Sequence, residues 1–149
     1  TRKKLANIST KERCYDCPNS GIYSPQFSRK TYDALFDKAG KILKDGASVI
    51  IDATFIKSAE RITAKKLAEK NGAMFYIIEC ILEEETARSR LEKRMNECTP
   101  SDGRWEIYLA QKNSIDPVSE APASNHIIID TAKSTEDNVN IILDRLGYV

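Results

Sequence analysis

The order of elements in the sequence predicts an α/β fold, in which a parallel sheet is covered by helices on both faces. Helix-like and strand-like segments alternate along the chain, and the strand-like segments are short, β-branched and continuously apolar. Such runs are typical of strands that are buried on both sides. Glycines, prolines and helix-capping residues separate the segments. Because the chain has 149 residues, we expect residues 1–149 to form a single domain.

The first half of the chain predicts two helices with a strand between them. Ser24 can cap a helix that has Pro25 at its first position, and apolar residues then follow helical spacing until Gly46. The segment Ser48–Asp52 is a short β-branched run, which predicts a buried strand that ends in a carboxylate. A second helix is expected from Ser58 to Asn71.

The middle of the chain predicts a second strand and two further helices. The run Met74–Cys80 is apolar and bounded by polar residues, as expected for a buried strand. Glutamates then stand where a helix begins, which favours a helix over residues 83–96 because its amino end attracts negative charge. A turn-rich break over residues 97–104 precedes a short helix, Trp105–Lys112.

The last part of the chain predicts a loop, a strand and a helix. Residues 116–125 have the composition of a loop, and His126–Asp130 is the third β-branched strand. Ser134 can cap a final helix with one apolar face, and Gly147 ends it.

The composition excludes several classes of protein. The chain carries 23 Lys and Arg against 22 Asp and Glu, so no global field attracts bulk nucleic acid or an anionic membrane. Hydrophobic residues make up 41% and charged residues 30%, which excludes a disordered chain and a membrane-spanning protein. The basic start is not followed by the apolar stretch of a secretion signal, and four cysteines are too few for a disulfide scaffold. We therefore expect a cytoplasmic protein.

Two groups of polar residues are candidates for chemistry. Asp52 and Thr54 follow the first strand, at the edge of a parallel sheet where ligands bind, and can hold a magnesium-bound water or a substrate hydroxyl. Arg90 and Arg94 are four residues apart, hence on one helical face, and can bind phosphate oxygens. The alternatives are a turn-forming aspartate and a solvated helix face on which Glu92 and Glu97 form ordinary ion pairs.

Other conspicuous residues favour structural roles. His126 opens a strand without a partner in sequence, and Trp105 and Tyr108 have the spacing of packing residues on a helix. Cys14 and Cys17 form a C-x-x-C pair, but a zinc site usually needs a second such pair. A metal-binding module built on these cysteines is therefore the weakest alternative.

Several short segments occur in an order that is found in one known family. They are Arg2–Ala6, Gly21–Ser24, Val49–Phe55, Arg90–Arg94, Ser101–Asp102 and Ile129–Thr131. Together they span essentially the whole chain, which resembles the AAA-like P-loop kinases related to polynucleotide kinase and zeta toxin.

This resemblance implies ATP-dependent, magnesium-assisted transfer of a phosphoryl group to a hydroxyl of a small-molecule or nucleotide-like acceptor. Asp52 matches an acidic residue that organises the acceptor or the magnesium shell. Arg90 and Arg94 match lid arginines that close over the ATP phosphates. Thr131 matches the loop that borders the adenine, and Arg2 matches an arginine that holds the acceptor.

The sequence departs from the family in one respect. None of its 149 residues form a G-x-x-x-x-G-K-[ST] phosphate-binding loop. We expect a front strand-helix-strand unit of about 40 residues to be missing, so that the strands at Val49 and Phe75 face a gap. A partner segment or self-association would cover the exposed sheet edge, and the chain alone would not turn over ATP. The alternative is a non-catalytic α/β binding or interaction module that has lost the nucleotide cradle.

Overall fold

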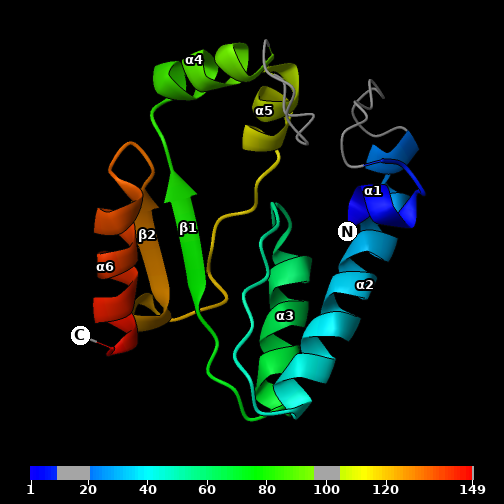
Figure 1. Ribbon diagram of the computed structural model, residues 1–149, viewed down its shortest axis with the longest axis vertical. Coiled ribbons are helices and arrows are strands. Elements are labelled where there is room, and N and C mark those ends of the chain that lie inside the picture. Colours follow the sequence, from blue (N-terminus) through cyan, green and yellow to red (C-terminus); the bar gives the residue numbers. More distant parts are fainter. Residues whose placement is uncertain (10–20, 96–104, 149) are drawn as a thin grey trace.

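The computed structural model describes residues 1–9, 21–95 and 105–148 (Figure 1). Its elements are α1 (Arg2–Leu5), η1 (Gly21–Tyr23), α2 (Pro25–Lys44), α3 (Ser58–Lys70), β1 (Ile77–Ile81), α4 (Glu84–Met95), α5 (Trp105–Lys112), η2 (Ala123–Asn125), β2 (His126–Asp130) and α6 (Thr135–Leu146). The predicted α/β class with a parallel sheet is confirmed. The short helix α1 was not expected from the sequence. No helix in these ranges is long and apolar enough to cross a membrane.

The sheet consists of β1 and β2 in the part of the chain that is described. The two strands are parallel, with Ile77 opposite His126 and Ile81 opposite Asp130. Helix α6 packs against β2, and Ile127, with 2% of its surface exposed, is the most buried large side chain. One edge of β1 therefore has a neighbour and the other has none.

The predicted strand at Ser48–Asp52, the first of the three in chain order, is not formed, so this prediction is wrong. These residues are in no strand, and Ile50 exposes 91% of its surface. In Figure 1 the segment rises between β1 and α3 without joining the sheet. A β-branched run favours an extended backbone, but a strand also needs a hydrogen-bonded neighbour. None of the described residues supplies that neighbour.

The helices α2 and α3 form a packed pair that stands beyond β1, on the side away from β2 (Figure 1). The predicted cap of α2 is present, because the Ser24 hydroxyl accepts a hydrogen bond from the Phe27 N–H at 3.3 Å. At Gly40 the helices approach closely, since a Cβ there would lie 3.3 Å from a methyl carbon of Leu67. The two helices predicted from spacing and caps are confirmed.

The helices α4 and α5 form a second pair. An ion pair joins Lys112 to Glu84, and the guanidinium of Arg88 lies 5.6 Å from the centre of the Trp105 ring. That ring stacks on Tyr108 at 5.2 Å. The aromatic residues therefore pack between the two helices, as the sequence favoured over a base-stacking platform.

The caps of α6 agree with the sequence prediction. The Ser134 hydroxyl accepts a hydrogen bond from the Asp137 N–H at 3.1 Å. Gly147 ends the helix in the left-handed conformation, with φ of 77°, which glycine adopts without steric cost.

Candidate functional site

The carboxylate of Asp52 lies at the same end of the molecule as the carboxyl end of β1. Asp52 is exposed, and it is close enough to Cys80 for its charge to act on the thiol. Burial first, then Asp52 and then Glu79, raise the pKa of Cys80. Asp52 therefore lies near the carboxyl end of β1, although the segment before it does not join the sheet.

The Thr131 loop closes the same end of the sheet. Both the N–H and the hydroxyl of Thr131 donate to the carbonyl of Ile81, at 2.9 and 3.1 Å. The hydroxyl expected to border a nucleotide is thus bonded to the last residue of β1. Thr131 fixes the loop at the strand ends, next to the start of α4.

Arg90 and Arg94 lie on α4, which crosses above the carboxyl end of β1 in Figure 1. Both are exposed, and neither has a hydrogen bond or ion pair with the described residues. Glu92 instead pairs with Arg88 at 2.9 Å. The alternative pairing of the two arginines with Glu92 is therefore not seen, and Glu97 lies outside the described residues.

Arg2 is held in a different part of the molecule. Its guanidinium donates to the Ile22 carbonyl and, at 3.1 Å, to the Ser28 hydroxyl, and it lies over the Tyr23 ring. Figure 1 shows α1 beside the amino end of α2, across the molecule from the sheet. The structure does not bring Arg2 together with Arg90 and Arg94.

A tight turn follows Asp52 and places Thr54. Phe55 has φ of +44°, which is rare for a residue with a bulky side chain. Its N–H donates to the Tyr32 hydroxyl at 2.8 Å, and the Thr54 hydroxyl lies 3.4 Å from the same oxygen. Burial is the main cause that raises the pKa of Tyr32, so this phenol stays protonated.

A buried ion pair lies behind this turn. The Arg61 guanidinium makes two hydrogen bonds with the Glu120 carboxylate, both at 2.9 Å, and both side chains are almost fully buried. The same guanidinium donates to the carbonyl oxygens of Phe55, Asp116 and Pro117. Sequence reasoning could not find this pair, because Arg61 and Glu120 are 59 residues apart and each has charged residues nearby.

A second set of hydrogen bonds ties the loop that contains Asp116 to α3. The Asp116 N–H donates to the Ile56 carbonyl at 2.9 Å, and the Ser58 N–H donates to the Asp116 carboxylate at 3.0 Å. The bond from Ser58, and then that from Lys57, hold the pKa of Asp116 below its ordinary value. Asp116 therefore caps the start of α3.

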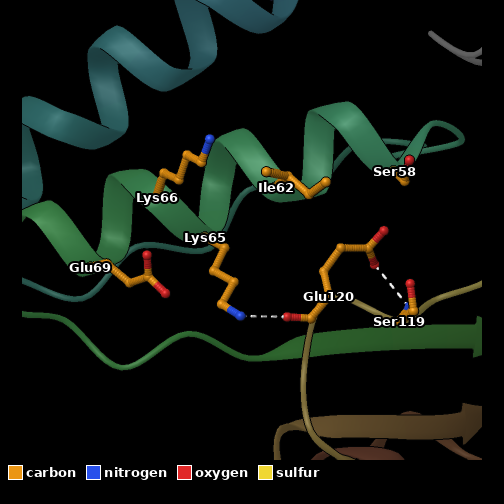
Figure 2. A pocket seen from close by; sticks show the side chains of 7 residues that line it. All are labelled: Ser58, Ile62, Lys65, Lys66, Glu69, Ser119 and Glu120. Carbon is orange, nitrogen blue, oxygen red and sulfur yellow. Dashed lines mark hydrogen bonds between the residues drawn. The ribbon is translucent and has the colours of Figure 1, made fainter.

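An open hollow of about 430 Å³ lies along the flank of α3 (Figure 2). It is lined by Ser58, Ile62, Lys65, Lys66, Glu69, Ser119 and Glu120. The Lys65 side chain extends across the hollow, and its ammonium donates to the Glu120 carbonyl at 2.8 Å. None of the site residues predicted from the sequence lines this hollow, which is a groove between α3 and its tethered loop.

By residue type, His126 and the cysteines are possible metal ligands. His126 pairs with Glu79 of the neighbouring strand at 2.8 Å, a partner that its sequence position could not reveal. The C-x-x-C pair, Cys14 and Cys17, lies outside the described residues. Among the residues that are described, no group of three or more His, Cys, Asp or Glu side chains is arranged to hold a metal ion.

Comparison with known protein families identifies a match. Residues 2–118 match the model of an AAA domain family, whereas no curated protein and no solved structure matches the chain. The match covers well over half of the sequence and includes the Asp52 segment, Tyr32, Arg61 and α4. The chain therefore belongs to this AAA domain family, whose members are P-loop, nucleotide-binding domains of the kinase type.

Proposed function

We propose that this chain contributes the carboxylate and the arginines of an ATP- and magnesium-dependent phosphotransferase site. The phosphoryl group would pass to a hydroxyl of a small-molecule or nucleotide-like acceptor, as in the kinases related to polynucleotide kinase and zeta toxin. Family membership supports nucleotide binding. The location of Asp52, Thr131 and α4 at one end of the sheet supports a shared site.

The observation that carries the proposal is the unpaired edge of β1. Among the described residues, strand β1 pairs with β2 and with no other strand. In Figure 1 the segment Ser48–Asp52 rises on the side of β1 away from β2, beyond the loop that follows α5. Ile50, in this segment, and Met74, three residues before β1, expose 91% and 80% of their surfaces. An unpaired strand edge together with exposed apolar side chains in neighbouring segments favours the insertion of a further strand.

We assign this space to one occupant, the strand that leads into a G-x-x-x-x-G-K-[ST] loop. The 149 residues contain no such loop, so another polypeptide segment must supply it. A strand inserted parallel to β1 would place its carboxyl end, and hence the phosphate-binding loop, beside Asp52. The same insertion would complete the sheet and the nucleotide site.

The described residues fit the nucleotide and the metal in different ways. Arg90 and Arg94 have free donors that suit phosphate oxygens. Asp52 offers one carboxylate, which is enough for magnesium, because this ion commonly takes one or two protein carboxylates and fills its remaining positions with phosphates and water. When bound, magnesium would offset the charge on the transferred phosphoryl group. Asp52 would orient the water or hydroxyl that faces it.

The test compares the 149-residue chain with a version extended at its amino end by the polypeptide encoded upstream. Magnesium-dependent release of phosphate from ATP is measured for both, and ATP affinity is measured by calorimetry. We expect activity only where the added segment contains the phosphate-binding loop. Arg90→Ala and Arg94→Ala should each lower ATP affinity by about tenfold, the value of one charge-assisted hydrogen bond.

Arg88→Ala is the matched control, because Arg88 lies on the same helix, is exposed and already pairs with Glu92. It should leave ATP affinity within about twofold of the wild type. Equal effects of all three substitutions would contradict the assignment of Arg90 and Arg94. A loop-containing protein that binds no ATP would instead favour the non-catalytic α/β binding or interaction module.

A further inference from the structure

Phe55 has an unusual backbone conformation directly after the candidate site residues. Its φ of +44° is strained for a bulky residue and persists only where the surroundings enforce it. Phe55 is one residue after Thr54 and three after Asp52. Whatever holds this turn therefore also determines where the carboxylate and the hydroxyl lie.

Tyr32 holds the amide side of the turn from α2. Its hydroxyl accepts the Phe55 N–H at 2.8 Å and lies 3.4 Å from the Thr54 hydroxyl. The two rings are in contact, with centroids 5.3 Å apart, and Phe36 packs against both. Because Tyr32 exposes only 7% of its surface, its hydroxyl cannot exchange this partner for water without a rearrangement.

Arg61 holds the carbonyl side of the turn from α3. It donates to the Phe55 carbonyl at 2.8 Å and to the Ile56 carbonyl at 3.5 Å. Its other donors bond to the Glu120 carboxylate and to the carbonyls of Asp116 and Pro117. With 3% of its surface exposed, the guanidinium is fixed in a single orientation. The peptide groups on either side of Phe55 are thus bonded to two different helices.

We propose that Tyr32 and Arg61 are positioning residues, which hold Asp52 and Thr54 at the edge of the site by enforcing the left-handed turn at Phe55. The effect of these two residues on catalysis rests on the proposed function, but their effect on the position of Asp52 and Thr54 can be tested separately. Neither residue needs to touch ATP or the acceptor. Their effect passes through a backbone segment of four residues, Asp52–Phe55.

The first test is Tyr32→Phe in the full chain, with Tyr76→Phe as the matched control. The Tyr32 substitution removes only the hydroxyl and leaves the ring packed. The exposed Tyr76 hydroxyl makes a long hydrogen bond to the Met74 sulfur, at 4.0 Å, and is not bonded to the Phe55 turn. Amide resonances and hydrogen exchange of residues 52–55 are followed by NMR. We expect exchange at Phe55 to become at least about tenfold faster in Tyr32→Phe and the Asp52 and Thr54 resonances to shift. In Tyr76→Phe they should stay unchanged.

A second variant, Arg61→Lys, tests the other side of the turn. Lysine keeps the positive charge beside Glu120 but has three donors on one nitrogen, so it cannot reproduce the fork that reaches Phe55. The same resonances should shift. Resonances of residues 52–54 that coincide with those of the wild type in both Tyr32→Phe and Arg61→Lys would overturn the proposal.

The catalytic consequence is measured on the loop-containing protein. Tyr32→Phe should lower kcat for magnesium-dependent ATP hydrolysis by about tenfold and leave KM for ATP within about twofold, because Asp52 and Thr54 face the acceptor side. Loss of both parameters together would indicate general disruption and would count against positioning. If the wild-type protein consumes no ATP, the proposed function fails, while the NMR result still decides the positional claim.

Discussion

The Arg61–Glu120 ion pair offers the sharpest test of how this domain is held together. We expect Arg61→Met to leave the Glu120 carboxylate buried without a counter-charge, and Glu120→Met to leave the guanidinium in the same state. Both side chains expose less than 5% of their surface, so solvent cannot compensate. Removing one partner of such a pair costs about 3–5 kcal/mol, a large share of the roughly 5–15 kcal/mol that holds a domain together.

The double variant Arg61→Met/Glu120→Met should be far less destabilised than the sum of the single variants. It removes both charges, and what remains is the loss of a donor at the carbonyls of Phe55, Asp116 and Pro117. At about 1 kcal/mol for each hydrogen bond, the double variant should lose about 3 kcal/mol. The two single variants together should lose about 6–10 kcal/mol, so the coupling energy is expected to be at least about 3 kcal/mol.

Guanidinium chloride unfolding, followed by circular dichroism, measures these free energies, with the slope of each transition checked for a constant unfolded state. The matched control is the exposed pair of Arg88 and Glu92, for which the same cycle should give less than about 1 kcal/mol. If the losses of unfolding free energy for the Arg61 and Glu120 substitutions add within about 0.5 kcal/mol, the pair does not act as a unit. The claim that Arg61 of α3 holds the Phe55 turn would then be contradicted.

Three further predictions concern acid, a helix cap and the open edge. Hydrogen bonds from Arg61 hold the pKa of Glu120 below its ordinary value of 4.5, so this carboxylate stabilises the fold above pH 4.5 and loses that effect as the pH falls through the folded-state pKa. The stability gap between the wild type and Glu120→Gln, measured by urea unfolding at several pH values, should therefore narrow below pH 4.5, and a constant gap would contradict this. Ser134→Ala removes the acceptor of the first turn of α6 and should cost about 1 kcal/mol, seen in thermal unfolding, whereas Ser134→Asp should restore most of it. Ile50→Thr should reduce self-association in sedimentation experiments without lowering the unfolding free energy, because 91% of the Ile50 surface is exposed; unchanged association would show that another surface is responsible.

The sequence predicted the helices well because their signals are local. Ser24 and Ser134 cap their helices by hydrogen bonds within three residues, and Gly147 ends α6 through its own backbone freedom. The prediction of a strand at Ser48–Asp52 was wrong because strand formation is not decided locally. Its composition is that of a strand, but strand formation depends on a neighbour that none of the described residues provides.

The candidate site was predictable only in part. The β-branched run drew attention to Asp52, which lies near the carboxyl end of β1 although its own segment forms no strand. Helical spacing predicted that Arg90 and Arg94 share one helix, as they do in α4. Tyr32, Arg61 and the turn at Phe55 were not found, because their roles come from contacts between residues 6 to 59 positions apart. An arginine among other charged residues of a helix gives no sign in the sequence that it will be buried.

The extended segment Ser48–Asp52 connects the incomplete sheet with the proposed chemistry. The segment is held in place without strand hydrogen bonds. Helix α2 ends just before it, and the Phe55 turn just after it is bonded to Tyr32 of α2 and Arg61 of α3. Segments that are fixed at both ends lose little further entropy when a strand pairs with them. An incoming strand would therefore form its hydrogen bonds and bury Ile50 at small conformational cost. Asp52 would then lie beside the carboxyl end of the incoming strand. Completion of the sheet and assembly of the nucleotide site would then be one event, so ATP should strengthen the association of the phosphate-loop segment with this chain.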